Sequence, residues 1–246
     1  MKSYTEFLQG KIVTAPVSGF AVRPEEINPV LKPHQRDAVM WACRGGRRAL
    51  FESFGLGKTV QELEYARLVL EHIGGGMALI VMPLGVRQEV THDAVVLLGM
   101  EEPIYITHTM QADHEDIYIT NYERVRDGDV DPQAFDCCVL DEAAVLRSFG
   151  SKTYQTFLPL FRGIKYKLVA TATPSPNRLK ELIHYAGFLE IMDTKPAIED
   201  KPDALDLKDV KGDIAFSHVS FAYNEGQQEQ TAVLSDSARA VQDSLQ

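Results

Sequence analysis

Short apolar stretches alternate with amphipathic stretches along most of this chain, and this alternation restricts the fold more than any other feature. GMALIVMP (76–83) is apolar throughout, as expected of a strand buried on both faces, whereas KTVQELEYARLVLEH (58–72) has apolar residues at helical spacing. Such alternation predicts an α/β fold, with a parallel sheet covered by helices on both faces. Strands are predicted within 47–53, 76–83, 103–109, 116–122, 134–144 and 165–174, and helices within 33–43, 58–72, 84–99 and 177–192.

The chain has 246 residues, enough for one sizeable core and an appendage. Prolines make residues 1–30 a largely irregular leader. The main domain is predicted over 31–194. Residues 195–246 are a linker and a poorly structured tail, too short and polar for a core of their own.

Charge and cysteine content narrow the function classes. A net charge of −10 excludes a protein that holds nucleic acid by overall charge, so any DNA contact must be local. Cys43, Cys137 and Cys138 suit reduced core positions better than disulfides or a zinc site. No apolar run approaches the roughly 20 residues needed to cross a bilayer. The N-terminus also lacks the apolar core of a signal peptide. We therefore expect a cytoplasmic protein without membrane contact.

A glycine-rich turn followed by Lys-Thr lies between a predicted strand and a predicted helix, in FESFGLGKT (51–59). Glycines let backbone N–H groups turn toward phosphate oxygens, and the helix start adds its positive end. Lys58 would reach the β- and γ-phosphates of ATP, and Thr59 would offer its hydroxyl to Mg²⁺. The residues predicted to cradle the phosphates are Gly55, Leu56 and Gly57. A plain turn with a surface lysine is the alternative.

A pair of carboxylates ends another predicted strand, in VLDEAA (139–144). A carboxylate at the end of a buried strand can hold Mg²⁺, and its neighbour can orient a nucleophilic water. Asp141 is predicted to serve the metal and Glu142 to act as general base. An acidic turn exposed to solvent is the alternative, and the glycine-rich turn earlier in the chain disfavours it.

Six segments, in order over residues 31–182, resemble the motifs of Swi/Snf-type translocases in helicase superfamily two. They are LKPHQRDAVMWA (31–42, glutamine motif), FESFGLGKT (51–59, motif I), ALIVMPLGVRQEV (78–90, motif Ia), IYITNYE (117–123, motif Ib), VLDEAAVLRSFGSKT (139–153, motif II) and LVATATPSPNRLKEL (168–182, motif III). The residues of these motifs are most similar to those of helicase-like proteins of bacteriophages and prophages. The resemblance implies a RecA-like P-loop domain, the helicase ATP-binding domain, over 31–194, with ATP and Mg²⁺ as cofactors.

The resemblance also implies roles for individual residues. Gln35 would recognise the adenine edge, and Lys58, Thr59, Asp141 and Glu142 would take the phosphate, metal and base roles already described. A glutamine on a helix surface is the alternative for Gln35.

Further positions follow from motifs Ia, Ib and III. Thr171 and Thr173 would couple the nucleotide state to the neighbouring domain. Pro83, Thr120 and Asn121 would lie near the nucleic-acid backbone, although ordinary strand ends and turns explain these three nearly as well.

Two positions depart from common patterns, and a third residue has two possible roles. Glu52 stands where the general phosphate-loop pattern has glycine, although the Swi/Snf motif commonly has an acidic residue there. Ala144 stands where motif II usually has histidine, which keeps both carboxylates but makes coupling to motif III uncertain. Phe20 could stack on adenine, but a core position is favoured.

The family works with two RecA-like domains, and the second supplies arginine fingers worth roughly 10³–10⁵ in rate. We expect the partner domain to be provided in cis or in trans. The tail offers another resemblance, since 204–227 is similar to the opening of an ABC-transporter ATPase domain, with Tyr223 at the adenine-stacking position. We expect a junction near Thr194, with a joined or remnant segment beyond it.

These observations favour an Mg·ATP-binding first motor domain of a DNA helicase or translocase. As this chain alone, it is expected to hydrolyse ATP slowly or not at all and to bind DNA weakly and in a salt-sensitive way. The alternative is a non-catalytic nucleotide-dependent binding module that docks onto a partner. An ABC-type ATPase is disfavoured, because no phosphate loop follows Tyr223.

Overall fold

The chain folds around a six-stranded sheet with strand order β1-β6-β5-β2-β4-β3. The computed structural model describes residues 15–148, 150–175 and 181–192. Every strand pairing is parallel, so all the strands end at the same edge of the sheet. The α/β fold predicted from the sequence is confirmed. The strands are β1 (Arg47–Phe51), β2 (Met77–Met82), β3 (Ile104–Tyr105), β4 (Asp116–Asn121), β5 (Cys137–Leu140) and β6 (Tyr166–Thr171).

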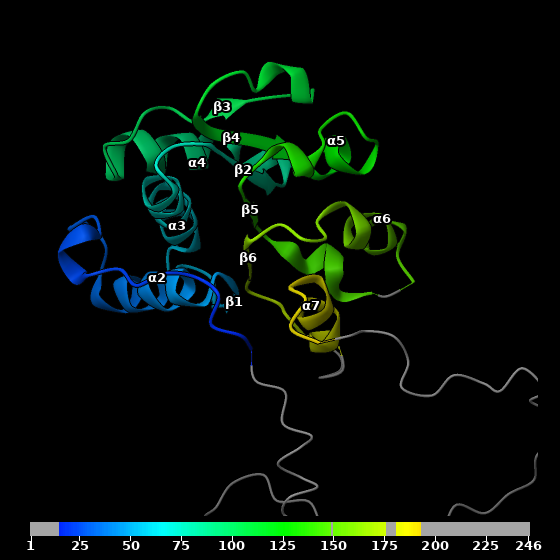
Figure 1. The fold of residues 1–246 in the computed structure, drawn as a ribbon, viewed down its shortest axis with the longest axis horizontal. Helices are drawn as coiled ribbons and strands as arrows, with labels where there is room; N and C mark the ends of the chain where they lie inside the picture. The colour runs from blue at the N-terminus through cyan, green and yellow to red at the C-terminus, as the bar shows by residue number, and fades with distance from the viewer. Residues whose placement is uncertain (1–14, 149, 176–180, 193–246) are drawn as a thin grey trace, which may run out of the picture. The chain divides into compact units, whose positions relative to one another are not determined.

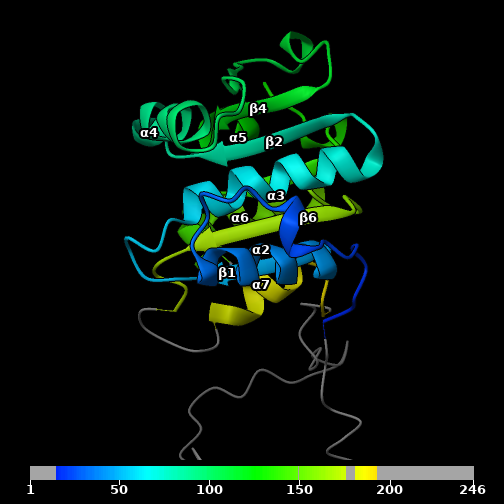
Figure 2. The same ribbon diagram turned by 90° about the vertical axis from the view of Figure 1, so that its left-hand side faces the viewer.

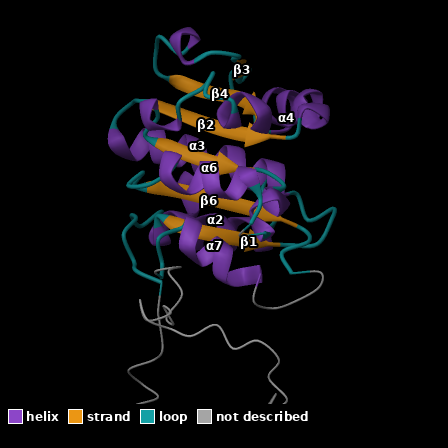
Figure 3. Cartoon of the chain, turned by 90° about the vertical axis from the view of Figure 1, so that its right-hand side faces the viewer, coloured by secondary structure: helices purple, strands orange, loops and turns teal. Residues whose placement is uncertain are grey.

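Helices cover both faces of the sheet (Figure 1). The face toward the viewer in Figure 2 carries α2 (Pro33–Gly45), α3 (Lys58–Ile73) and α4 (Arg87–His92). The opposite face, shown in Figure 3, carries α5 (Tyr122–Arg126), α6 (Lys152–Leu160) and α7 (Leu182–Phe188). Short helical turns are η1 (Pro24–Glu26), η2 (Leu84–Val86), η3 (Asp93–Leu97), η4 (Thr109–Gln111), η5 (Pro132–Ala134) and η6 (Ala143–Arg147).

Alternation along the strands divides the core into two layers. In β2, Ile80 packs with residues of α2 and α3, whereas its neighbours Leu79 and Val81 pack with residues of α5 and α6. Successive side chains of a strand point to opposite faces, so a strand that is apolar throughout serves both layers.

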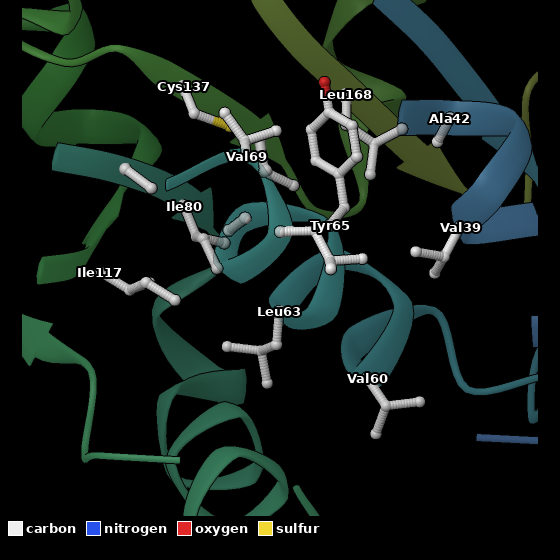
Figure 4. Close-up of a cluster of buried hydrophobic side chains, with 14 of the residues drawn as sticks. Val39, Ala42, Val60, Leu63, Tyr65, Val69, Ile80, Ile117, Cys137 and Leu168 are labelled. Atoms are coloured by element: carbon white, nitrogen blue, oxygen red, sulfur yellow. The ribbon is translucent and has the colours of Figure 1, made fainter. Parts of the chain in front are cut away.

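The first layer is centred on α3, which begins at the glycine loop (Figure 4). Tyr65 is fully buried there beside Val69 and Leu168, and its hydroxyl donates a hydrogen bond of 2.7 Å to the Gly46 carbonyl. This bond satisfies the only polar atom of the side chain and ties α3 to the start of β1. The three cysteines are buried and free, as predicted.

Two predicted elements differ in the structure. The helix expected over 84–99 is divided into η2, α4 and the π-helical turn η3. The strand expected over 103–109 is limited to Ile104–Tyr105, because the Gln111 Oε1 accepts from the backbone N–H groups of Thr107 (2.7 Å) and His108 (2.9 Å). Both η6 and α6 lie where no helix was expected. Of the predicted helix 177–192, Leu182–Phe188 is helical, and residues 177–180 lie outside the described residues.

The described part of the leader packs against α2 and α3. The Phe20 N–H donates to the Cys43 carbonyl at 2.9 Å, and the Phe20 ring stacks on His72 at 3.9 Å between centroids. His72 lies in the last turn of α3, at the opposite end from the glycine loop, so Phe20 takes the packing role that the sequence favoured. The predicted linker and tail, 195–246, lie outside the described residues.

A buried lysine ties β6 to the chain around α7. The Lys167 Nζ donates to the carbonyls of Phe161 (3.1 Å) and Phe188 (2.9 Å) and lies 2.8 Å from the Glu190 carboxylate. Burial lowers the pKa of Lys167, and the adjacent Glu190 opposes this effect. Glu190 also accepts from Arg47 at 2.6 Å, so the cluster joins β1, β6 and α7.

Lys167→Ala should lower the free energy of unfolding by about 2–4 kcal/mol, because it removes the donor of two carbonyls and of a partly buried carboxylate. Chemical denaturation of the chain and the variant measures the difference. Lys152→Ala is the control, since Lys152 is exposed in α6 and should change stability by less than about 0.5 kcal/mol. Equal losses in the two variants would contradict the structural role of Lys167.

Candidate functional site

The glycine loop connects β1 directly to the N-terminus of α3. Gly55 has a φ of 79° and Gly57 a φ of 77°, in the left-handed region that favours glycine. α3 then begins at Lys58, and the N–H groups of its first turn have no acceptor within the helix. A turn of unpaired amides at the positive end of a helix is suited to an anion such as phosphate.

Two side-chain amides hold the loop in shape. Gln35 on α2 donates to the Leu56 carbonyl at 2.9 Å and accepts from the Lys32 N–H at 2.8 Å. Gln61 on α3 donates to the Glu52 carboxylate at 2.7 Å. Glu52, which stands where the general phosphate-loop pattern has glycine, therefore has a structural role, because its carboxylate links the end of β1 to α3. The sequence analysis did not identify Gln61, whose signal was an amide one turn after Lys58.

Lys58 lies at the start of α3 with only 9% of its surface exposed. Its Nζ donates to the Glu52 carbonyl at 3.4 Å and lies 5.4 Å from the centre of the Phe54 ring. The ring itself is 76% exposed. Thr59, the predicted Mg²⁺ ligand, is half-buried beside Lys58. The alternative of a surface lysine after a plain turn does not describe this buried ammonium group.

Asp141 follows β5 at the same edge of the sheet and is 8% exposed. Burial raises the pKa of Asp141 to about 6, and the neighbouring Glu142 charge adds to this rise. A hydrogen bond from the Glu142 backbone and the positive charge of Lys58 act in the opposite direction. Lys58 acts electrostatically on Asp141, and the glycine loop and the acid pair follow strands that end at the same edge of the sheet.

Glu62 is a further acidic residue of this site that the sequence analysis missed. It lies one turn after Lys58 on α3 and is 1% exposed, and its carboxyl group lies within hydrogen-bond reach of the Asp141 carboxyl group. Burial raises the pKa of Glu62 well above its usual value, Asp141 raises it further, and Lys58 opposes the rise. The only sequence signal was its helical spacing from Lys58.

Glu142 adopts an unusual backbone conformation beside the end of β6. Its φ is 47° and its ψ is 52°, a left-handed conformation that costs a non-glycine residue roughly 1–2 kcal/mol. The Thr171 hydroxyl donates to the Glu142 Oε1 at 2.8 Å, and the Thr173 hydroxyl lies 3.4 Å from the same oxygen. The structure thus brings the two predicted coupling threonines to the predicted general base.

The three residues predicted near nucleic acid have different environments. Thr120 is fully buried, and its hydroxyl donates to the Ile106 carbonyl at 2.9 Å, so its side chain is not accessible to a nucleic acid in this conformation. Asn121 is 8% exposed and caps α5 by accepting from the Arg124 N–H at 3.2 Å. Pro83 is half-buried after β2. The position of Thr120 near nucleic acid stays a prediction, and any contact there would involve its backbone and not its hydroxyl.

The residues at this edge suit a magnesium nucleotide. Lys58 and the amides of the first turn of α3 supply positive groups for phosphates, and Asp141 and Glu62 supply buried carboxyl groups for a cation. The two acidic side chains buried side by side are the sharpest sign, because burying a pair of acids next to each other is costly unless a cation joins them. A Cβ at Gly57 would lie 2.3 Å from the Gln35 Nε2, so this position of the loop requires glycine.

The sequence pattern of the SNF2-related domain matches residues 34–196. This match covers most of the chain. The chain belongs to the SNF2-related domain family. The resemblance to Swi/Snf-type proteins of helicase superfamily two is thereby confirmed.

Relatives of this SNF2-related domain are similar over part of their length. The ATP-dependent helicase fft2 of Schizosaccharomyces pombe is 28% identical over 157 residues, which is 57% of this chain and 12% of fft2. The SWI2/SNF2 ATPase core of Sulfolobus solfataricus, solved in complex with dsDNA, superposes with a TM-score of 0.56 at 21% identity. That match covers 70% of this chain and 38% of the other, and it confirms the RecA-like fold. This chain thus spans only a minor part of each relative.

A short match of another kind is also present. An uncharacterized ABC transporter ATP-binding protein of Bacillus subtilis, YwjA, is 42% identical over 41 residues, 17% of this chain and 7% of that protein. This is the class of protein that residues 204–227 are predicted to resemble. Among the described residues, none of the helices combines the length and apolar character needed to cross a membrane.

Gly57→Ala should destabilise the domain more than Gly55→Ala. Both positions have positive φ, but a Cβ at Gly57 would lie 2.3 Å from the Gln35 Nε2, whereas at Gly55 it meets nothing within 4 Å. We expect a loss of about 1 kcal/mol for Gly55→Ala, from the left-handed backbone alone, and about 2–3 kcal/mol for Gly57→Ala. Urea denaturation compares the two, and equal losses would contradict the contact with Gln35.

Asp141→Asn should stabilise the nucleotide-free domain at neutral pH. The pKa of Asp141 is about 6 in the fold and 3.8 in its ordinary state, so the fold binds this proton more tightly than the unfolded chain. The resulting stabilisation is present below pH 4 and is lost as the pH rises through 6. We expect the variant to gain about 1–3 kcal/mol at pH 7.5 and little at pH 4.5.

Denaturation at both pH values measures this gain. Asp127→Asn is the control, because the Asp127 side chain is 56% exposed. A gain for Asp141→Asn that does not depend on pH would show that desolvation of its carboxylate is not the cause.

Proposed function

We propose that this SNF2-related domain binds Mg·ATP at the glycine loop and is the first motor domain of a DNA helicase or translocase. Hydrolysis requires a second RecA-like domain that completes the site. The convergence of Lys58 with the buried carboxyl groups of Asp141 and Glu62 at one end of α3 carries this proposal. A plain turn with a surface lysine offers no reason for two carboxyl groups to be buried beside it.

The binding roles follow from the chemistry of each group. The loop Gly55–Gly57 and the first amides of α3 bind the phosphates, and Lys58 exchanges its contact with the Glu52 carbonyl for phosphate oxygens. Thr59 and Asp141 hold Mg²⁺. Gln35 keeps one free N–H and one acceptor lone pair for adenine, because each half of its amide has a single protein partner.

Glu142 is the residue placed to assist hydrolysis. Its carboxylate orients the attacking water and accepts its proton, and the hydroxyls of Thr171 and Thr173 hold the Oε1 in place. Mg²⁺, when bound, supplies charge neutralisation for the phosphates. Pre-positioning by two hydroxyls explains why Glu142 keeps a strained backbone.

The partners proposed are DNA and a second RecA-like domain, in cis or in trans. The match to fft2 covers 12% of that protein, so most of a helicase of that kind lies outside the matched region. An arginine from the second domain is worth roughly 10³–10⁵ in rate, so the matched domain tested by itself should hydrolyse ATP slowly. DNA binding by this chain alone is weak, because its net charge is −10, and it is salt-sensitive, because it depends on local contacts to phosphates.

One observation favours a second candidate, a nucleotide-dependent binding module without turnover. Ala144 has only a methyl side chain without a polar atom, and its backbone N–H donates to the Glu142 carbonyl at 2.6 Å. No side chain at this position can therefore relay a change at Glu142 to the end of β6. This candidate predicts nucleotide binding without hydrolysis even when a second helicase half is supplied.

Lys58→Ala should weaken the affinity for a fluorescent Mg·ATP analogue by at least about tenfold, because a buried charge-assisted contact to phosphate is lost. Fluorescence titration measures it, with Lys152→Ala as a control of unchanged affinity. Equal binding by the chain and Lys58→Ala would falsify the phosphate-loop assignment.

Turnover separates the two candidates. The chain alone should hydrolyse ATP slowly, with little increase on adding duplex DNA, and faster when a second helicase half is fused to it. A strong DNA-stimulated rate from the chain alone would show that the second domain is dispensable. Binding without turnover in the fusion would select the non-catalytic module.

A further inference from the structure

A single arginine connects the segment after the acid pair to the segment after β6. Arg147 is half-buried at the end of η6. Its Nε donates to the Ala144 carbonyl at 2.9 Å, and its Nη1 donates to the Thr173 carbonyl at 3.4 Å. The N–H donors of a planar guanidinium have fixed directions, so these two bonds define the position of the Ala144 carbonyl relative to the Thr173 carbonyl.

Glu142 depends on the same two segments. The Thr173 hydroxyl lies 3.4 Å from the Glu142 Oε1, and the Thr173 N–H donates to the Thr171 hydroxyl at 3.1 Å. Thr173 is therefore linked to Glu142 through its side chain and to Arg147 through its carbonyl. A displacement of η6 that moves Arg147 must shift Thr173 or break one of these bonds.

Arg147 also acts on a third element. Burial raises the pKa of Tyr185 on α7, and the charge of Arg147 opposes this rise. The turn η6 packs against α6, α7 and β6. A movement of η6 would therefore change its packing against these three elements.

We propose that Arg147 is the positioning residue that transmits a change at Glu142 to the segment 171–175. This inference rests on the proposed nucleotide binding. Ala144 contributes only its carbonyl to the connection, and the side chain that makes the link comes three residues later. Arg147 touches neither the glycine loop nor Lys58 in the structure, so it affects the response to nucleotide and not the affinity for it.

Hydrogen exchange of residues 171–175 tests the inference in four proteins, with and without a non-hydrolysable Mg·ATP analogue. They are the chain itself, Arg147→Met, Arg147→Lys and the control Arg162→Met, whose side chain is exposed before β6. In the chain and the control, the analogue should slow exchange of this segment by about fivefold or more. Arg147→Met should show no such change, and Arg147→Lys an intermediate one.

Nucleotide affinity is measured in parallel and should stay within about threefold in all four proteins. Nucleotide-induced protection in Arg147→Met equal to that of the chain would overturn the inference. So would a loss of affinity in that variant as large as in Lys58→Ala, because Arg147 would then act in binding itself.

If the chain binds no nucleotide, the proposed function fails, and the nucleotide-free exchange rates decide about Arg147. Faster exchange of residues 171–175 in Arg147→Met than in Arg162→Met supports the connection to Thr173. Equal rates overturn it. Circular dichroism shows whether Arg147→Met folds. If it does not fold, Arg147→Lys, which keeps the charge and one donor group, is compared with Arg162→Met in its place.

Discussion

The parallel pairing of β6 with both β1 and β5 is the constraint on which the rest of the structure depends. Its register places Phe51 opposite Thr171 and Leu140 opposite Val169, so these strands end close together at one edge. The glycine loop, the acid pair and the coupling threonines each follow one of these strands. Reversing any strand would send its loop to the opposite edge. Ligands of open α/β sheets bind at this edge for the same reason.

The site buries two acidic side chains. Asp141 and Glu62 lie side by side where water is largely excluded, and burial raises the pKa of both, which favours their neutral forms. Glu142 adds a left-handed backbone held by hydrogen bonds from β6 and the segment after it. Such features destabilise the domain without a ligand, and the proposed binding of Mg·ATP would offset this cost. Stability is instead supplied by the two apolar layers on either side of the sheet.

Local sequence patterns predicted the strands and the main helices well, because the spacing of apolar residues and the positions of glycines depend only on residues close together in the chain. They failed where a distant partner decided the outcome. The strand after residue 103 is short because the Gln111 side chain accepts from two of its N–H groups. The turn η6 and helix α6 were missed because small and polar residues at 143–153 carry little apolar periodicity.

The sequence by itself determined the α/β class, the family, and the residue types of a phosphate loop and an acid pair, since each depends on neighbours along the chain. Only the tertiary structure decided that Gln61 closes the loop through Glu52, that Glu62 is buried beside Asp141, and that Arg147 joins two segments. These roles depend on groups that the sheet brings together. They could not be predicted, because the spacing of residues along a chain does not determine which strand ends become neighbours in the sheet.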